Sequence, residues 1–487
     1  MDRHATENSH AEDYRQGLPE SLRNKDILRR LLMWFAPADA LFEKEDFHGN
    51  VRWTGQSVVI QAIICMLYVG LNVTQAFESA QAMLDILQIE GGISSYNTFM
   101  NALTRYRNLF TERVRARLQE MAEEVAGEVF RTSGWLPIAF DGSRVDAPRT
   151  KSNEAAFCAK NYGHGTTARS KKKKSKGMRR KRNEKNPASQ PLPQIWVTAF
   201  WHMATQLMWT WRLGPSDSSE RTHVMDVLKT EKFPKKTLFC GDAGFVGYSL
   251  WKTILEQPER HFIVRIGANV MLLQEHADYE LHKDSYVLCW PKDRMAVGDP
   301  PLHLRLVKIK DDQGRTWWLL TSVLDKEQLT IEQMKEYYRM RWSIEIAFRG
   351  LKQTLGKHTM RCRNSERLLV ELDWSLFAMT LAALMAFREQ RKVEPKHDGK
   401  QRKRSLARTL HALRWALDHP QDFGDAKTNL RTKLADALVQ EYNNRTDKRA
   451  RYRPKNPGKK PLGDPKVRTM TPCELAQLHQ FEPNPRV

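Results

Sequence analysis

A phenol, two cations and a carboxylate recur at helical spacing near residue 340, in the segment KEYYRMRWSIEIAFRGLKQ (335–353). Offsets of three, seven and fourteen residues from the first of them return to the same side of a helix. The residues on that shared face are Tyr338, Arg341, Glu345 and Lys352. A carboxylate flanked by cations suits a metal ion together with a phosphate, because the acid can hold the metal while the cations contact the anion.

An apolar stripe runs beside the polar one and indicates how such a helix would be held. Its members are Ile344, Phe348, Leu351 and Leu355. This periodicity predicts that the helix packs onto a core and leaves the polar stripe facing a cleft.

Two aspartates earlier in the chain follow apolar runs that are typical of strands. Asp141 follows LPIAF and precedes Gly142, and Asp242 follows TLFCG. Open α/β sheets place chemistry at strand ends, and a glycine after the acid lets the backbone turn away. Either aspartate alone is more simply a helix-cap or turn residue, but together with Glu345 they favour a site. Asp146 is an alternative to Asp141, although it lies further from the apolar run.

Three acids brought together suit the cleavage of a phosphodiester by two divalent ions. Carboxylates hold such ions about 4 Å apart, where one activates the attacking oxygen and the other stabilises the leaving oxygen. Mg²⁺ keeps several waters and takes only a few carboxylates plus substrate phosphate. We therefore expect Asp141, Asp242 and Glu345 to hold Mg²⁺ or Mn²⁺. Arg341 would then make a forked contact to phosphate and Lys352 a point contact.

The chain resembles the DDE transposases of bacterial insertion sequences, in particular the IS-four-type group marked by a Y-x2-R-x3-E-x6-K (YREK) signature. All four signature positions match, from Tyr338 to Lys352. FDGS resembles the first-aspartate motif of the family and GDAGFVGY the second, while ELDWSLFAMTLAAL (371–384) resembles the helix that follows the signature. The resemblance covers residues 135–390 and, in outline, the N-terminal helices.

The resemblance implies an enzyme with a ribonuclease H-like catalytic domain, interrupted by a β-rich insertion (266–326) before the glutamate helix. Such enzymes use two Mg²⁺ or Mn²⁺ ions to cleave double-stranded DNA at the terminal inverted repeats of a transposon. They then join the freed ends to target DNA, a cut-and-paste reaction that passes through a hairpin. Family members assemble as homodimers on paired ends.

The resemblance also implies roles for residues around the acids. In the family, the signature tyrosine, arginine and lysine contact phosphates near the cleaved end, and a tryptophan of the insertion stacks on a flipped base. Trp317 or Trp318 matches that tryptophan in position, although WWLLTSVL is also a plain core strand. Arg349 lies on the polar face too, where it either touches phosphate or is simply solvated.

The elements that must position these residues begin with an all-helical part, expected to be a DNA-binding domain (1–130). Helical periodicity covers 72–87 and 94–110, separated by a glycine-containing break. The second helix is polar, and the two form either a helix-turn-helix that reads a DNA groove or an ordinary helical hairpin. Its polar residues include Asn97, Asn101, Arg105 and Arg107.

Residues 131–390 change to an α/β pattern, with β-branched and aromatic runs bounded by turn residues. Strands are predicted at 135–145, 194–203, 206–214, 236–245 and 260–266. Helices are predicted at 219–230 and 247–257, and strands followed by helices imply a mixed α/β layer. Short strands then alternate over 267–325, which reads as an all-β insertion.

The chain is strongly basic, with 79 Lys plus Arg against 57 Asp plus Glu and a formal charge of +22. Such an excess favours a polyanion as partner, with nucleic acid ahead of an anionic membrane surface. The apolar segments 58–71 and 377–387 are too short to span a bilayer and read as buried helices. The N-terminus is polar and lacks a signal core, so we expect a cytoplasmic protein at the bacterial nucleoid.

Two basic stretches carry much of the charge. The loop at 165–190 is dense in Lys and Arg, which predicts disorder and either salt-dependent contact with phosphates or a solvated loop. The segment 391–487 reads as a basic C-terminal tail that contacts DNA or a partner subunit, and its run 444–460 contains prolines that argue against a packed fold.

Two alternatives to a transposase remain open from the sequence. A related metal-dependent nuclease would cut without joining. A catalytically silent, domesticated DNA-binding relative would keep the charge and the helices while its acids changed, and the presence of all three acids disfavours it.

Overall fold

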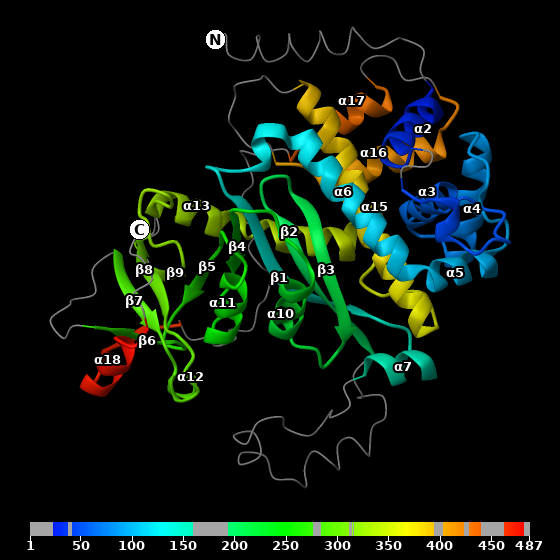
Figure 1. Cartoon of the computed structure of the whole chain (residues 1–487). Helices are drawn as coiled ribbons and strands as arrows, with labels where there is room; N and C mark the ends of the chain where they lie inside the picture. Colours follow the sequence, from blue (N-terminus) through cyan, green and yellow to red (C-terminus); the bar gives the residue numbers. More distant parts are fainter. Residues whose placement is uncertain are drawn as a thin grey trace, which may run out of the picture.

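A ten-stranded mixed sheet lies at the centre of the computed structural model, with helices on both faces and a group of helices at one end (Figure 1). The structure describes residues 23–37, 41–158, 193–275, 284–310, 314, 316–393, 403–422, 428–439 and 462–481. The chain is therefore of mixed α/β class, as the sequence predicted.

The sheet has the strand order β10-β6-β7-β8-β9-β5-β4-β1-β2-β3. β1, β4 and β5 run parallel, whereas β1, β2 and β3 form an antiparallel meander. The strands of this half are β1 (Leu136–Asp146), β2 (Gln194–His202), β3 (Leu207–Pro215), β4 (Thr237–Gly241) and β5 (Arg260–Ile266). All five predicted strands are thus present, including the hairpin of β2 and β3.

Helices cover this half of the sheet on both sides. In Figure 1, α10 (Glu220–Thr230) and α11 (Tyr248–Leu255) lie in front of the strands, and the helices that carry the YREK signature pass behind them. The short helix α7 (Lys151–Phe157) follows β1. The basic loop expected at 165–190 lies outside the described residues.

The helical end of the molecule is built around one long apolar helix, α15 (Ser365–Val393). It is the one described helix long and apolar enough to cross a membrane, but 94% of its apolar window is buried inside the fold. Helices packed against α15 or against one another at this end are α2 (Asn24–Phe35), α3 (Gly55–Leu67), α4 (Val73–Ile86), α5 (Tyr96–Arg105) and α6 (Arg107–Ala126). Short 3-10 helices also occur at Lys44–Asp46 and Gly127–Phe130. The apolar segment 377–387 is therefore confirmed as part of a buried helix, whereas 58–71 is helical and buried only as far as Leu67.

The polar segment expected as one helix over 94–110 is divided in two at Tyr106. On α5, the side chains of Asn97 and Asn101 accept hydrogen bonds from Arg367 of α15. At the start of α6, the guanidinium of Arg107 lies 2.7 Å from the buried carboxylate of Asp373. Hydrogen bonds and an ion pair thus link this polar segment to α15, while Asn97, Asn101 and Arg105 stay exposed.

The block at 267–325 forms strands, but these extend the central sheet. β9 (Thr316–Thr321) pairs with the edge of β5, because the unpaired edge of a strand is satisfied by another strand. The others are β6 (Met271–Gln274), β7 (Asp284–Cys289) and β8 (Leu302–Lys310), with the short helix α12 (Lys292–Ala296) between β7 and β8. The expectation of an all-β insertion thus misses this helix and the continuity with the main sheet.

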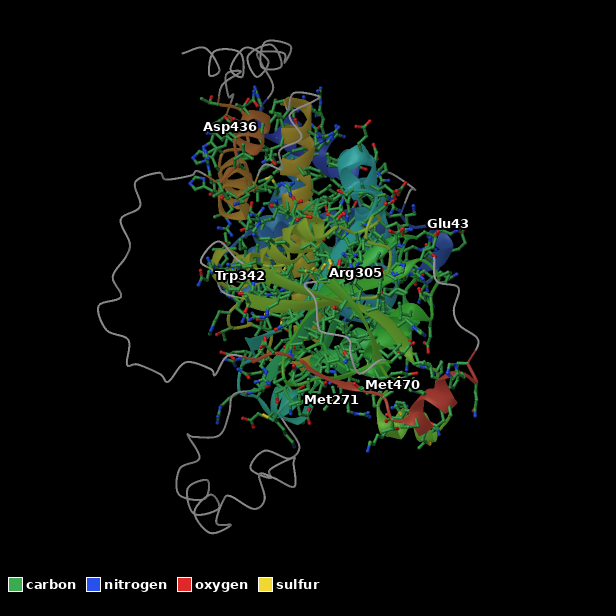
Figure 2. All side chains as sticks on the ribbon, turned by 90° about the vertical axis from the view of Figure 1, so that its left-hand side faces the viewer. Glu43, Met271, Arg305, Trp342, Asp436 and Met470 are labelled. Atoms are coloured by element: carbon green, nitrogen blue, oxygen red, sulfur yellow. The ribbon has the colours of Figure 1, made fainter. Side chains whose placement is uncertain are left out.

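Described parts of the C-terminal segment are folded, unlike the tail expected over 391–487. Helices α16 (Leu406–Asp418) and α17 (Leu430–Ala435) pack against α15 and α2, since apolar residues recur at helical spacing within basic sequence. Further on, β10 (Lys466–Thr469) pairs with β6, and α18 (Pro472–Leu478) follows. Figure 2 labels Met271 and Met470 near this junction. The proline-containing run 444–460 lies outside the described residues.

Candidate active site

The YREK signature lies on two helices and a π-helical turn, where the sequence predicted one helix. α13 (Ile331–Met340) ends before Arg341, α14 (Ser343–Arg349) follows, and the π turn covers Gly350–Thr354. At the break, the hydroxyl of Ser343 donates to the Met340 carbonyl and accepts from the indole N–H of Trp201 on β2. Trp342, also at the break, is 56% exposed at the surface of the molecule (Figure 2).

The apolar stripe of the signature segment is buried, as predicted. Its four residues are between 0% and 6% exposed, namely Ile344, Phe348, Leu351 and Leu355. α14 packs against β1 through this side. The helix is therefore held close to the strand that carries the first aspartate.

Asp141 and Asp242 lie at the same level on neighbouring parallel strands. Ala139 of β1 is paired with Cys240 of β4, and each aspartate comes two residues after that pair. Side chains alternate along a strand, and adjacent strands lie about 4.8 Å apart, so the two carboxylates emerge on the same face. Asp242 follows the end of β4, whereas Asp141 lies within β1, which continues to Asp146 along β2.

Backbone N–H groups orient both carboxylates. Asp141 Oδ1 accepts a hydrogen bond of 2.8 Å from the N–H of Gly142, and Asp242 Oδ1 accepts one of 2.7 Å from the N–H of Gly244. Each bond leaves the other carboxylate oxygen available to a ligand.

Arg341 lies between the first aspartate and the glutamate. Its guanidinium is 3.9 Å from the Asp141 carboxylate and 3.8 Å from that of Glu345. The residue is only 7% exposed, and its Nε has no hydrogen-bond partner. Arg341 thus lies between two acids in a buried position.

Burial and neighbouring charges raise the proton affinity of the Asp141 carboxylate. Burial first, with smaller contributions from the carboxylates of Asp242 and Glu345, raises the pKa of Asp141 to about 6, against the Gly142 hydrogen bond and the cation of Arg341. The guanidinium of Arg341 thus lies within 4 Å of the carboxylates of Asp141 and Glu345, and Asp242 follows the strand paired with that of Asp141.

A fourth carboxylate, which the sequence did not reveal, borders the same face. Glu220 is the first residue of α10, after the cap residue Ser219, and it packs over Gly142. Burial raises its pKa to about 7, with further contributions from Asp141 and Asp242. An acid in the first turn of a helix is ordinarily favoured by the helix dipole, so no sequence pattern distinguishes Glu220 from other such acids.

Tyr338 is half-buried beside the acids and next to a second cation that the sequence did not reveal, Arg265 of β5. Burial raises the pKa of Tyr338, while the guanidinium groups of Arg341 and Arg265 oppose the rise and Asp242 adds to it. The neighbouring Tyr337 is buried, and its hydroxyl donates to the Thr132 carbonyl. The phenol that faces the acids is therefore Tyr338.

The two tryptophans of the insertion point in different directions. Trp318 is 5% exposed, and its indole N–H donates to Asp464 at 2.7 Å. Trp317 is half-buried, and its ring centroid lies 5.0 Å from that of Tyr338. Only Trp317 of this pair therefore lies against the signature.

Lys352 and Arg349 follow along the signature. Lys352 is half-buried in the π turn, where burial lowers its pKa and Asp146 opposes that shift. Arg349 is exposed on α14. Asp146 accepts a hydrogen bond of 2.7 Å from Gln194 and lies 3.8 Å from His358, so its carboxylate is already engaged away from the acids.

The donor chemistry of the site fits a hard divalent cation. All four acids offer oxygen ligands, and nearby guanidinium groups oppose their repulsion, Arg341 at Asp141 and Glu345 and Arg144 at Glu220. Within the described part of the chain, no three Asp, Glu, His or Cys side chains stand close enough together to enclose an ion as they are placed.

Residues 136–381 match the family model described as a transposase DDE domain. A curated relative, the transposase InsG for insertion sequence element IS4 of Escherichia coli (strain K12), is 23% identical over 252 residues, which cover 49% of each chain. The match thus spans about half of the length of that relative. A solved structure of the piggyBac transposase synaptic complex with hairpin DNA aligns over 88% of each chain at 11% identity, with a TM-score of 0.36, too low to establish a common fold.

Proposed function

This chain belongs to the transposase family with a DDE domain, and from that premise we propose that it moves an insertion sequence by cleaving DNA at the element's ends and joining them to a target. Asp141, Asp242 and Glu345 are the proposed ligands of two Mg²⁺ or Mn²⁺ ions. The observation that supports this proposal is the position of Arg341, which lies within 4 Å of the Asp141 and Glu345 carboxylates, while Asp242 follows the strand paired with that of Asp141.

The strand order supports a ribonuclease H-like catalytic domain. In that fold three antiparallel strands are followed by two parallel ones, and the order β3-β2-β1-β4-β5 agrees with it. Residues 131–390 would form this domain, with 266–326 as the β-rich insertion ahead of the glutamate helix. The helices of 1–130 and the segment 391–487 would flank it and add DNA or partner contacts.

The residues around the acids divide the work of holding DNA. When bound, divalent ions would stabilise the charge on the oxygens that attack and leave phosphorus. Tyr338 and Lys352 would contact phosphates near the cleaved end, with Arg349 reaching the strand from the exposed side of α14. Arg341 would exchange its two carboxylates for a phosphate, since a guanidinium matches either anion bidentately. Trp317 would receive a flipped base beside Tyr338.

The partner would be double-stranded DNA carrying terminal inverted repeats, bound by a homodimer at paired ends in the cytoplasm, at the nucleoid. The formal charge of +22 supports a polyanionic partner. The hairpin step and the cut-and-paste route come from the family resemblance. A nuclease that cuts without joining is the second candidate, because it would need the same acids.

Replacement of the glutamate tests the function. Glu345→Gln should abolish nicking of a duplex that carries the inverted repeats flanking the reading frame, while DNA binding stays within about twofold. The matched control is Glu336→Gln, an exposed acid on α13. Nicking by the Glu345→Gln variant would refute the assignment. Joining of a pre-cut end by the wild type separates a transposase from a nuclease.

A further inference from the structure

A hollow of about 800 Å³ lies between the N-terminal helices and the loop that follows the signature. Its lining is rich in long side chains that donate hydrogen bonds, including Asn72, Gln75, Arg361, Arg363 and Arg367. One acidic residue, Glu78, stands against these three arginines in the described lining. We call this hollow the arginine groove.

The loop that forms one wall is held by a buried ion pair. Glu371 of α15 is 2% exposed, and its carboxylate accepts from Lys357 Nζ at 2.8 Å. The same carboxylate accepts the backbone N–H groups of Arg361 and Cys362, at 3.1 and 2.9 Å. Burying a charged pair costs free energy unless its hydrogen bonds are satisfied. The two backbone N–H groups satisfy the Glu371 carboxylate here, and the network holds the loop in one conformation. Its result is that Arg361 and Arg363 are presented to solvent.

The opposite wall is also suited to an anion. α4 begins at this wall, where Asn72 and Gln75 form a capping box, and the positive end of a helix dipole favours a phosphate. Between the walls, Arg367 is held in place by its hydrogen bonds to Asn97 and Asn101 on α5. Both walls therefore present donors, from parts of the chain far apart in sequence.

The arginine groove is connected to the active site through β1. The N–H of Asp146, the last residue of β1, donates to the His358 carbonyl, and the backbone carbonyl of Asp146 accepts from the N–H of Met360. Five residues of strand separate Asp141 from Asp146, which is about 17 Å at about 3.3 Å per residue. Each nucleotide of B-DNA advances about 3.4 Å along the helix axis, so a duplex lying with its axis along β1 would place the groove roughly five base pairs from the acids.

We propose that the arginine groove binds the sugar-phosphate backbone of the transposon-end duplex, five or more nucleotides from the cleaved phosphate. The proposal rests on the proposed function for the identity of the duplex. Arg361 and Arg363 contact consecutive phosphates, and Arg367 lines the floor between the two walls. Duplex DNA is favoured over an acidic protein segment because the groove lies in line with the acids that act on DNA.

Binding of a fluorescent 30-base-pair duplex to the full chain, measured from 50 to 300 mM NaCl, tests the proposal. The double variant Arg361→Ala/Arg363→Ala should bind roughly 10- to 100-fold more weakly at low salt. The slope of log affinity against log salt should fall by about 2, because each lost phosphate contact contributes about 0.9. Both residues are exposed, so the melting temperature should be unchanged.

The control Arg29→Ala/Arg30→Ala removes two exposed arginines from α2. If this control loses as much DNA affinity as the Arg361→Ala/Arg363→Ala variant, the effect comes from net charge alone and the proposal is overturned. The proposal is also overturned if polyglutamate displaces the labelled duplex as effectively as unlabelled DNA does. The binding assay needs no cleavage, so it tests the arginine groove independently of the proposed transposase function. A wild type that binds through these arginines but never cuts refutes the function, and a wild type that cuts while the variant binds normally refutes the groove.

Discussion

Glu220 lies so close over Gly142 that a β-carbon built on residue 142 would come within 2.5 Å of Glu220 Oε1. Gly142 directly follows Asp141 in β1, while Glu220 begins a helix that packs on the same strands. The absence of a side chain at one position thus admits a fourth carboxylate to the edge of the acidic site.

Gly142→Ala should weaken divalent-cation binding without unfolding the protein. The new methyl group meets the end of a flexible side chain, so the Glu220 carboxylate is pushed aside and the strand stays paired. Titration with Mn²⁺, followed by electron paramagnetic resonance, should give a dissociation constant about 10-fold higher, the scale on which partners around a metal matter. Gly49→Ala is the control, because a β-carbon there has nothing within 4 Å. Unchanged Mn²⁺ affinity in Gly142→Ala would exclude a role for Glu220.

Arg341→Met should make the stability of the protein depend on metal. Without the guanidinium between Asp141 and Glu345, the acids repel one another, which costs about 1–3 kcal/mol of unfolding free energy in metal-free buffer. Addition of MgCl₂ should raise the melting temperature of this variant more than that of the wild type. The exposed neighbour Arg339→Met serves as the control. Equal rises in all three proteins would mean that Arg341 and the ion do not occupy the same place.

The sequence predicted the strands and the buried side of the signature because both depend on local apolar patterns. Ile344 and Leu351 follow helical spacing, and the strand runs are bounded by turn residues. The break at Arg341 was not visible, since its backbone keeps helical angles and only the hydrogen-bond pattern changes. The spacing of side chains does not specify which carbonyl accepts the hydrogen bond of each backbone N–H.

Features that arise from tertiary approach were not predictable. Glu220 reaches Asp141 only because α10 packs on β1, and Arg265 reaches Tyr338 only because α13 packs on β5. The pairing of β10 with β6 joins segments from distant parts of the chain within a basic composition that suggested a tail. Such contacts are set by packing, and no local pattern specifies them.

Trp317→Ala and Trp318→Ala form a matched pair of adjacent substitutions with opposite expected effects. Trp318 is buried and bonded to Asp464, so its loss should cost about 3–5 kcal/mol of stability. Trp317 packs on Tyr338 at the site, so its loss should leave the melting temperature within a few degrees and prevent base flipping. The fluorescence of a 2-aminopurine placed at the cleaved end should increase when the wild type binds. It should also increase with Trp318→Ala, assayed below the melting temperature of that variant, but not with Trp317→Ala. A fluorescence increase with Trp317→Ala would mean that a residue other than Trp317 stacks on the flipped base.

His202 should make the fold sensitive to mild acid. It is 1% exposed, stacks on Phe130 at 4.7 Å, and its Nδ1 accepts the N–H of Thr205. Burial first, with a smaller contribution from the nearby cation of Arg131, lowers its pKa to about 3, against a hydrogen bond to the Phe130 backbone. The unfolded chain takes up a proton near pH 6.5, whereas the folded protein does not until about pH 3. The stabilisation from neutral His202 is therefore complete above pH 6.5 and is lost as the pH falls toward 3, by about 1.4 kcal/mol per unit.

Between pH 7 and pH 5, wild type should lose about 2 kcal/mol more unfolding free energy than His202→Gln, in urea titrations at both pH values. His411→Gln, at an exposed site on α16, should lose as much as wild type. Equal losses in wild type and His202→Gln would show that His202 is protonated in the folded protein.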